Sequence, residues 1–247
     1  NYTPEVINNN FNMNSLCETF RNYAASRLHL YYDILNIYGE NGNMRALVKA
    51  LEYQGLKVSV DFKTIDDEIN FNDYDFIYIG SGLDESIDIT FEDLKKYRSD
   101  LEKYINDNKF ILATGNSLEL FSKLGILNYQ TKRIDFRIVG DQVFKTNLIN
   151  ERIIGFQNRE CIITDNKENS IFEVIKGCGY EPNNIKEGIR KNNFYGTFLL
   201  GPILIRNPYL LEYFVKEILK SKNLKYKKMK HDVSFKAYEE FLKNFVD

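Results

Sequence analysis

Three residues in the middle of the chain, Gly115, Asn116 and Ser117, lie where many α/β enzymes carry a nucleophile. Residues 110–114 have the apolar character of a buried strand, and an amphipathic helix begins directly afterwards at Leu118. Such a strand-to-helix turn presents a nucleophile on strained backbone, beside amide N–H groups that bind an oxyanion. The apex residue here is Gly115, which has no side chain. The turn therefore predicts a catalytic scaffold that lacks its nucleophile.

A second turn, formed by Gly80, Ser81 and Gly82, follows the apolar segment 75–79. Glycines after a buried strand allow backbone amides to approach a ligand closely. The same pattern is also typical of a tight turn without a ligand, and the local sequence favours this simpler interpretation.

Two hydroxyl groups near the apex, those of Thr114 and Ser117, would each need a general base to act as a nucleophile. The chain has two histidines, His29 and His231. His29 falls in the first predicted strand, where we expect a hydrogen-bonded core histidine. His231 falls in a basic tail, where we expect it to be solvated. Neither position indicates a catalytic base.

Four carboxylates, Asp33, Glu40, Asp84 and Glu119, fall within or near the predicted loops and the elbow helix. Their spacing matches no known metal-ligand pattern. The sequence therefore predicts no metal ion and no cofactor.

The predicted elements alternate between strands and helices in the first half of the chain. This order favours a mostly parallel sheet with helices on both faces. Residues 133–176 instead predict short strands without long helices, which is typical of an antiparallel extension. The predicted strands are 28–32, 56–62, 75–79, 110–114, 133–139, 142–148, 152–157, 171–176 and 194–200, and the predicted helices are 44–51, 91–106, a helix from 118, 208–220 and 233–245.

Composition indicates which kinds of partner and which cellular compartment to expect. A net charge of -2 gives no general attraction to nucleic acid or to an anionic membrane. The three cysteines, Cys17, Cys161 and Cys178, form no C-x-x-C pair and are too scattered for a disulfide framework, which suits the reducing cytoplasm. No apolar run approaches the roughly 18 residues of a membrane-spanning helix. We therefore expect a cytoplasmic protein that recognises its partners through local sites.

Five segments, taken in order, resemble one family. They are 35–43 (LNIYGENGN), 80–85 (GSGLDE), 154–158 (IGFQN), 177–188 (GCGYEPNNIKEG) and 196–204 (GTFLLGPIL). Together they are similar to the cobyric-acid-synthase type of class I glutamine amidotransferases, the family that includes the glutaminase subunit of bacterial lipid II isoglutaminyl synthase. The resemblance implies a flavodoxin-like α/β fold over residues 28–220, with residues 1–27 as an N-terminal extension and 221–247 as a tail and helix packed on the same domain.

In that family a cysteine thiolate attacks the glutamine side chain, and a histidine transfers the proton to the departing ammonia. The family's elbow, Ala-x-Cys-Gly-Gly-x-Gln, aligns with residues 113–119, so the cysteine position is Gly115. The histidine of the family's Leu-His-Gly-Pro segment aligns with Leu200. Since a positioned base alone contributes roughly 10²–10⁴-fold to rate, and the covalent route requires its nucleophile, we expect glutaminase activity to be absent.

The resemblance assigns roles to other residues as well. It implies an oxyanion-type turn made of Gly80, Ser81, Gly82 and Asn116. It also makes Arg137, Asn158 and Glu119 candidates for ligand binding, with Arg137 similar to the family's arginine for the glutamine carboxylate. A surface arginine on an edge strand is the simpler interpretation of Arg137.

The leading prediction is a catalytically degenerate amidotransferase-like subunit. The resemblance implies that its partner is a Mur-ligase-like synthase in cell-wall precursor amidation. Two alternatives remain open. One is an active amidotransferase or hydrolase with a relocated nucleophile, with Cys161 or Ser117 as the candidate. The other is a module that senses glutamine or a related small acid without turnover.

Overall fold

Strands, of which the inner ones are buried on both faces, form the centre of the molecule. In the computed structural model, which describes residues 23–230 and 233–246, they build a six-stranded sheet in the order β2-β1-β3-β4-β10-β9. All neighbours are parallel except β10 and β9, which confirms the predicted parallel sheet. The strands are β1 (Ala24–Leu30), β2 (Lys57–Lys63), β3 (Phe76–Ile79), β4 (Phe110–Thr114), β9 (Ile189–Lys191) and β10 (Phe194–Thr197).

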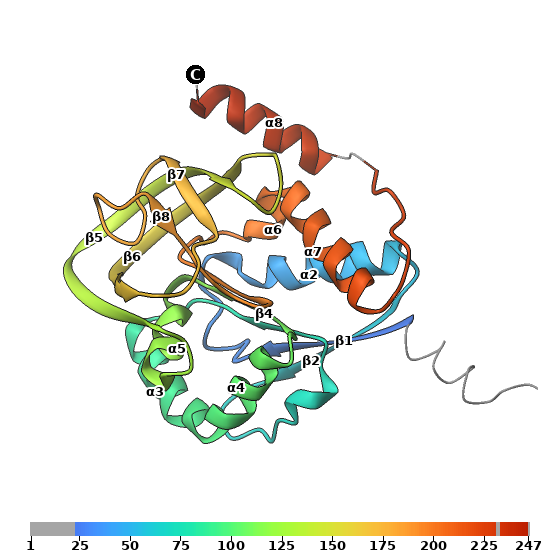
Figure 1. The fold of residues 1–247 in the computed structure, drawn as a ribbon, viewed down its shortest axis with the longest axis horizontal. Helices are drawn as coiled ribbons and strands as arrows, with labels where there is room; N and C mark the ends of the chain where they lie inside the picture. Colours follow the sequence, from blue (N-terminus) through green and yellow to red (C-terminus); the bar gives the residue numbers. More distant parts are fainter. Residues whose placement is uncertain (1–22, 231–232, 247) are drawn as a thin grey trace, which may run out of the picture.

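Helices cover both faces of this sheet, because alternate strand residues point to opposite sides. On one face, Ile77 and Ile79 pack with residues of α3 (Asp84–Leu94), α4 (Arg98–Asn106) and α5 (Leu118–Leu124). On the other, Phe76 and Tyr78 pack with α2 (Asn41–Tyr53), α6 (Ile203–Arg206) and α7 (Pro208–Ser221). Figure 1 shows α3, α4 and α5 below the sheet and α2, α6 and α7 above it. The sheet therefore has two separate apolar cores.

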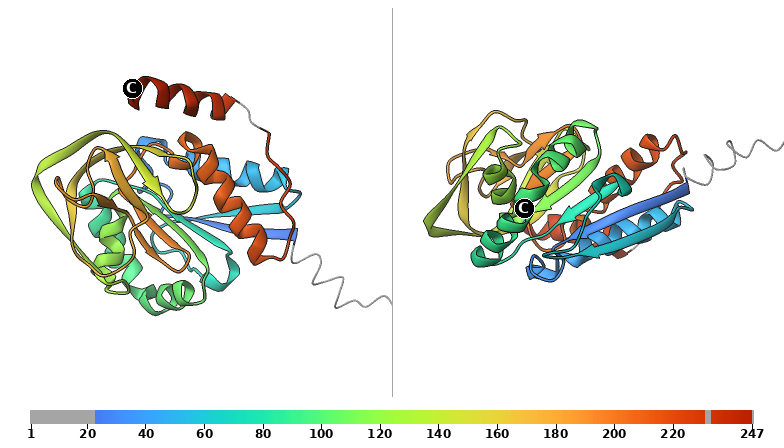
Figure 2. Two further views of the ribbon diagram at one scale, coloured as in Figure 1. Left: turned by 45° about the horizontal axis from the view of Figure 1, so that its top comes forward. Right: turned by 90° about the horizontal axis from the view of Figure 1, so that it is seen from below.

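A second, antiparallel sheet lies beside the first, in the order β6-β5-β7-β8. Its strands are β5 (Tyr129–Thr146), β6 (Ile153–Asn166), β7 (Phe172–Lys176) and β8 (Lys186–Glu187). The long β5–β6 ribbon projects to one side of the molecule in every view (Figures 1 and 2). The predicted antiparallel extension is thus confirmed.

Several predicted boundaries were wrong. The two strands predicted at 133–139 and 142–148 are one strand, β5, because the residues between them pair with β6 instead of turning. The helix predicted at 91–106 begins seven residues earlier, where Asp84 and Glu85 supply the acidic first turn that stabilises a helix N-terminus. It is interrupted by a 3₁₀ turn at Lys95–Tyr97. Strand β1 begins at Ala24, since residues 24–27 pair with β2.

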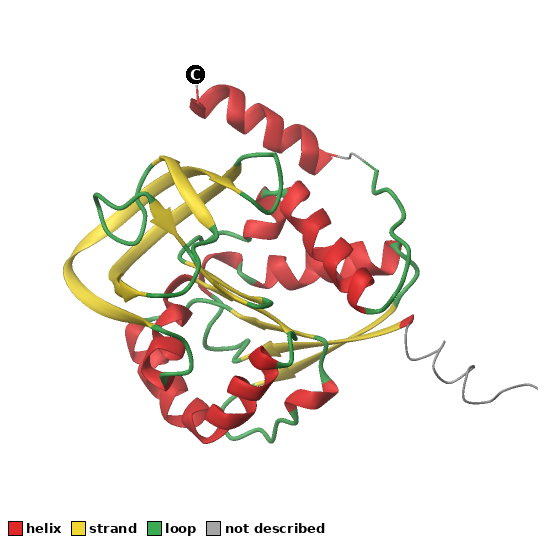
Figure 3. Ribbon diagram, viewed as in Figure 1, coloured by secondary structure: helices red, strands yellow, loops and turns green. Residues whose placement is uncertain are grey.

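Short 3₁₀ turns, coloured as helix in Figure 3, follow three of the strands, and a fourth joins α3 to α4. They are η1 (Ile37–Gly39), η2 (Phe71–Asp73), η3 (Lys95–Tyr97) and η4 (Gly115–Ser117). The turn η4 joins β4 to α5, so the predicted strand-turn-helix is present.

The C-terminal helix α8 (Val233–Val246) follows the tail and packs beside the second sheet (Figure 1). Tyr238, which is buried, lies with Val143 of β5 and Ile154 of β6 in a small apolar cluster of its own. In the part of the chain that the structure describes, no helix is both long and apolar enough to cross a membrane.

Candidate functional site

The apex of the strand-turn-helix is Gly115, at the carboxyl end of β4. Its φ of 63° lies in the left-handed region, which glycine adopts without steric cost. A Cβ atom built on Gly115 would lie 2.5 Å from Ser81 Oγ, 2.6 Å from Ser81 Cβ and 2.6 Å from Leu200 Cδ2. These separations are shorter than real Cβ contacts. The side chains of Ser81 and Leu200 therefore fill the space that a nucleophile at the apex would need.

Leu200, at the predicted histidine position, lies against this same apex. Its side chain is buried, and its backbone N–H donates to Phe156 O at 2.8 Å. The two positions that the family resemblance pairs are thus adjacent in space, as the chemistry would require. Both hold groups that can neither attack a carbonyl nor carry a proton.

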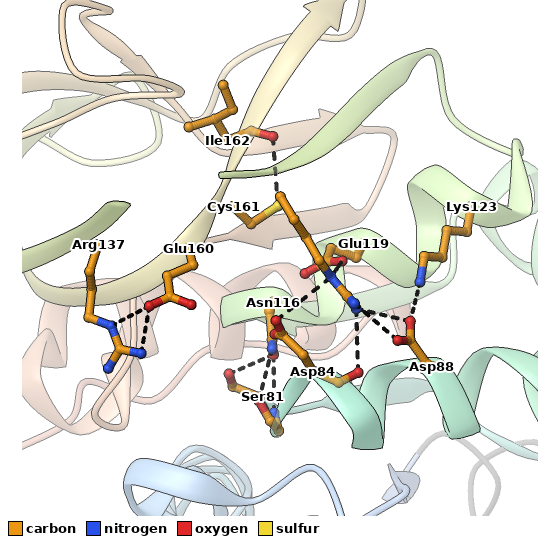
Figure 4. Close-up of polar contacts among 12 residues, drawn as sticks. Ser81, Asp84, Asp88, Asn116, Glu119, Lys123, Arg137, Glu160, Cys161 and Ile162 are labelled. Carbon is orange, nitrogen blue, oxygen red and sulfur yellow. Dashed lines mark hydrogen bonds and ion pairs between the residues drawn. The ribbon is translucent and has the colours of Figure 1, made fainter. Parts of the chain in front are cut away.

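The turn predicted to hold an oxyanion, residues 80–82, lies beside the apex and is closed by the side chain of Asn116. The Gly82 N–H donates to Asn116 Oδ1 at 3.1 Å, and Ser81 Oγ donates to the same oxygen at 2.9 Å. Asn116 Nδ2 in turn donates to Gly82 O at 2.8 Å. Figure 4 shows Asn116 directed at Ser81. The Gly82 N–H is consequently already used within the protein.

A buried carboxylate, Glu40, lies behind the apex. It accepts hydrogen bonds from Thr114 Oγ1, from Tyr78 Oη at 2.5 Å and from the Gly201 N–H at 3.0 Å. Burial raises the pKa of Glu40, while these donors oppose the rise. Glu40 ties the loop after β1 to both sides of the apex, a role that its place in the 35–43 motif did not reveal.

The four carboxylates considered for a joint site do not meet. Asp33 accepts from Thr64 Oγ1 at 2.6 Å, and Glu40 is enclosed behind the apex. Asp84 and Glu119 both lie next to Arg133, whose Nε is 3.8 Å and 2.8 Å from their carboxylate oxygens. Among the described residues, no group of three or more candidate ligands forms a metal site.

A cavity of about 280 Å³ opens in front of the apex. Its walls include the predicted ligand-binding residues Arg137, Asn158 and Glu119, so the structure brings all three together. The Arg137 guanidinium, however, pairs with Glu160, with Nε and Nη2 at 2.8 and 2.7 Å from Oε1 (Figure 4). Asn158 Nδ2 donates to Tyr38 Oη at 2.8 Å. The contact proposed for an amino-acid carboxylate is therefore occupied by Glu160.

Glu119 belongs to an ion network that the sequence did not indicate. Arg133 reaches Glu119 Oε2 at 2.8 Å and both oxygens of Asp88, at 2.9 and 3.0 Å. Lys123 also donates to Asp88, at 2.5 Å. Arg133 and Lys123 lower the pKa of Asp88 to about 2, whereas burial raises the pKa of Glu119 against the effect of Arg133. Of the two acids, Glu119 is the one whose charge is costly.

The two candidate replacement nucleophiles are poorly prepared for attack. Ser117 Oγ is buried and donates to the Thr114 carbonyl at 2.7 Å, so its proton faces a backbone oxygen and no base. Cys161 lines the cavity but is only 2% exposed. Burial, and next the charge of Glu119, raise the pKa of the Cys161 thiol to about 12. A thiol of this kind is almost wholly protonated at neutral pH.

His29 offers no base at this site. His29, in β1, is fully buried, and both of its ring nitrogens lack hydrogen-bond partners within the described residues. The prediction of a core histidine is right, but the expected hydrogen bond is missing, because the ring lies among Tyr32, Phe62 and Tyr78. His231 lies outside the described residues.

Comparisons with known proteins identify the fold and its sequence relatives. No protein-family model matches the chain. Among solved structures, a Thermotoga maritima protein described as PurLQS superposes with a TM-score of 0.55 over 80% of this chain and 96% of its own, at 14% identity. A glutamine amidotransferase from the same organism gives 0.53 over 87% and 89%, at 12% identity. The fold is therefore that of class I glutamine amidotransferases.

Proteins similar in sequence point to a narrower group than the solved structures do. The lipid II isoglutaminyl synthase (glutamine-hydrolyzing) subunit GatD of Streptococcus pneumoniae is 28% identical, over 89% of this chain and 88% of its own. Its counterpart in Staphylococcus aureus is 29% identical, over 79% and 85%. The chain is thus a homologue of the GatD subunits over most of its length, as the sequence motifs indicated.

Proposed function

We propose that this chain is a non-hydrolysing amidotransferase-like subunit that acts as a scaffold or binding partner for a synthase. The observation that carries the proposal is the filled space at the apex, where Ser81 and Leu200 lie within 2.6 Å of any Cβ placed on Gly115. A cysteine there would have to displace both side chains. The loss of the nucleophile is thus accompanied by packing of Ser81 and Leu200 into the space that its side chain would occupy.

The arrangement of the remaining groups supports the same proposal. Covalent hydrolysis of an amide needs a nucleophile, a proton carrier and free donors for the oxyanion. At the apex these correspond to Gly115, to Leu200 and to a Gly82 N–H that Asn116 already occupies. All three requirements are affected at one site, so restoring any single residue would not restore the chemistry.

We base the proposed partner on the names of the sequence relatives. Their names describe subunits of a glutamine-hydrolysing lipid II isoglutaminyl synthase. We propose that this chain pairs with a Mur-ligase-like synthase in cell-wall precursor amidation, in the cytoplasm. The free thiols of Cys161 and Cys178 suit such a reducing compartment.

Ammonia release from L-glutamine tests the proposal. The purified full-length chain, Cys161→Ala and Ser117→Ala are assayed side by side, alone and together with any synthase that copurifies with the tagged chain. We expect all three proteins to match the buffer control. Turnover by the wild-type chain that disappears in Cys161→Ala or in Ser117→Ala would replace the proposal with a relocated nucleophile.

The partner is tested separately by purifying the tagged chain from its own cells and identifying the proteins bound to it. A Mur-ligase-like protein in stoichiometric amount is the expected result. Its absence, under conditions in which the chain itself is recovered intact, would contradict the assignment of the partner.

A further inference from the structure

A second cavity, which we call the α2–α8 groove, lies on the face of the central sheet that carries α2. Its walls come from α2, from α6 and the start of α7, from Met229 and Lys230 of the tail, and from Ser234 and Phe235 of α8. Its volume of about 410 Å³ falls within the range for ligand sites, roughly 300–1,000 Å³. It shares no described lining residue with the cavity in front of the apex, so the two are separate.

The tail that forms one wall of the groove is fastened to the end of α2. Gln54 Nε2 donates to Lys227 O at 2.8 Å, and the Lys227 N–H donates to Gln54 Oε1 at 2.7 Å. The Lys227 ammonium also lies 4.6 Å from the centre of the Tyr53 ring. Figure 1 shows this part of the chain between α7 and α8. The wall is therefore held in place by the protein itself, which reduces the cost of ordering the groove when a ligand binds.

The interior of the groove is largely apolar. The buried side chains that line it are Ala50, Leu204, Pro208, Leu211 and Phe235. At its mouth, Ile205 is 45% exposed. A polar ligand group among such side chains would lose its hydration without gaining hydrogen bonds, whereas hydrocarbon gains by leaving water. The interior therefore suits an aliphatic chain.

The charges at the rim of the groove are all positive. Arg45 and Lys49, one helical turn apart on α2, and Lys230 of the tail line it and are exposed. None of the three forms an ion pair within the described part of the chain. No described lining residue is acidic. Since the whole chain has a net charge of -2, this positive charge is local, and it complements an anionic group above an apolar chain.

The volume of the groove limits what can enter it. One turn of an α-helix, about 5.4 Å long and 10–12 Å wide, occupies roughly 500 Å³. The groove is smaller than that, so it holds less than one turn of a partner helix. A single extended hydrocarbon chain fits the space.

We propose that the α2–α8 groove binds one aliphatic chain with a carboxylate head group, as in a free fatty acid. The chain packs against Leu204, Leu211 and Phe235, and the carboxylate is attracted by the cations at the rim. Because Phe235 belongs to α8, the bound chain also fastens this helix to the rest of the protein. The inference goes beyond the proposed function and is independent of it.

Calorimetric titration of the full-length chain near neutral pH, with hexanoate, octanoate and decanoate in turn, tests the ligand class. We expect saturable binding that tightens by about 10-fold for every two CH₂ groups added, the effect of burying them from water. Decylamine, with the same chain and the opposite charge, should not bind. Absence of saturable decanoate binding, or equal binding of decylamine, would overturn the inference.

Two variants test the place of binding. Arg45→Gln/Lys49→Gln should weaken decanoate by about 5-fold, the effect of losing two exposed charges. Its matched control, Lys57→Gln/Lys132→Gln, removes two exposed charges outside the groove and should bind as the wild type does. Ala46→Phe, on the groove wall, should weaken decanoate by at least 10-fold by filling the space, whereas Ala237→Phe, at an exposed position on α8, should not. Equal affinities of variant and control would contradict the assigned site.

The thermal midpoint without ligand shows whether each variant has folded, and the exposed positions 45 and 49 keep the test available if Ala46→Phe does not fold. Saturating decanoate should also slow amide hydrogen exchange in α8 of the wild type, and unchanged exchange there would place the ligand elsewhere. Sedimentation with phosphatidylglycerol vesicles tests a lipid surface as the alternative source of chain and charge. Binding to vesicles without binding of free decanoate would replace the inference with a membrane contact.

Discussion

Gly115 is closely packed by the side chains of its neighbours. Its backbone conformation alone would tolerate another residue at a cost of about 1–2 kcal/mol. The larger obstacle is Ser81, whose Oγ and Cβ lie 2.5 and 2.6 Å from the position of a new Cβ. Ser81 is also held in place by its bond to Asn116. The three residues at positions 81, 115 and 116 therefore form one packed unit in which each constrains the others.

This unit predicts the cost of adding a single methyl group. Gly115→Ala should lower the free energy of unfolding by about 2–4 kcal/mol, because overpacking adds to the cost of a left-handed alanine. Gly125→Ala is the matched control, since Gly125 has a φ of 64° and nothing within 4 Å of its Cβ position. It should cost only the conformational part, about 1–2 kcal/mol. Urea unfolding of both variants measures the difference, and equal costs would show that the apex has room.

The same unit predicts coupling to Ser81. In a Ser81→Gly background, Gly115→Ala should cost about 1 kcal/mol less than in the wild type, because the clashing side chain has gone. A double-mutant cycle from the same urea measurements gives this value. Additive costs would indicate that Ser81 is not what fills the apex.

His29 predicts how stability changes with pH. Burial disfavours the imidazolium and lowers the pKa of His29 from 6.5 to about 4. The unfolded chain takes up this proton near its ordinary pKa, and the folded chain does not. The stability that neutral His29 contributes is therefore complete above about pH 6.5 and is lost as the pH falls toward 4.

Replacing His29 by leucine should remove this dependence. Between pH 7 and 5, the free energy of unfolding of the wild type should fall by about 2 kcal/mol relative to His29→Leu. Taking the difference between the two proteins cancels groups common to both. One of these is Glu187, whose pKa burial raises to about 7, so that its unfavourable ionised form lowers stability as the pH rises. Parallel stability profiles would contradict the account of His29.

At the scale of elements, the sequence predicted those defined by clear periodicity and clear ends. Strand β4 and helix α5 were predicted correctly because the apolar run 110–114 ends at Gly115. The start of α3 was missed, since the predicted helix began at residue 91 and the helical segment 84–90 directly after the turn at 80–82 was not recognised. The single strand β5 was missed because Gly140 looks like a turn, although it pairs with Gln157 in the ladder.

The sequence predicted where the candidate site lies but not the side-chain contacts within it. Ordered motifs placed Gly115, Leu200 and the turn at 80–82 together, and the structure agrees. The hydrogen bonds that Asn116 Oδ1 accepts from Ser81 and Gly82 depend on one side-chain conformation, which no sequence pattern specifies. The pairing of Arg133 with Asp88 joins residues 45 positions apart across two elements. Contacts of this kind arise only when the fold brings the elements together.

The C-terminal helix α8 packs on α6, on α7 and on the second sheet, and we expect it to detach as a unit. Tyr238 and Phe235 are its buried anchors, and the Tyr238 hydroxyl donates to Arg152 O at 2.6 Å. Tyr238→Ala should raise amide hydrogen exchange across residues 233–246 and leave α7 protected. The control Lys236→Ala, at an exposed position on the same helix, should leave exchange unchanged. If α7 loses protection together with α8, the helix is part of the main cooperative unit.

For the whole molecule, the comparisons establish the fold, whereas the proposal of lost chemistry rests on the apex alone. The parallel sheet, both helical layers and the elbow remain, and the homology to GatD subunits spans most of the chain. At the apex, the Cβ position of Gly115 is filled by the side chains of Ser81 and Leu200, and the Gly82 N–H is bonded to Asn116. This packing is what supports the proposed scaffold role, since function resides in the site and not in the fold.

The central claim is tested most directly by ammonia release from saturating L-glutamine, followed over hours at high concentrations of the wild-type chain, with and without its copurified partner. The triple variant Ser81→Gly/Gly115→Cys/Leu200→His, which clears the apex and restores both reactive groups, is measured beside it. We predict that the wild-type chain releases no more ammonia than buffer. Catalytic release by the wild-type chain, with several equivalents of ammonia formed per protein, would contradict the account.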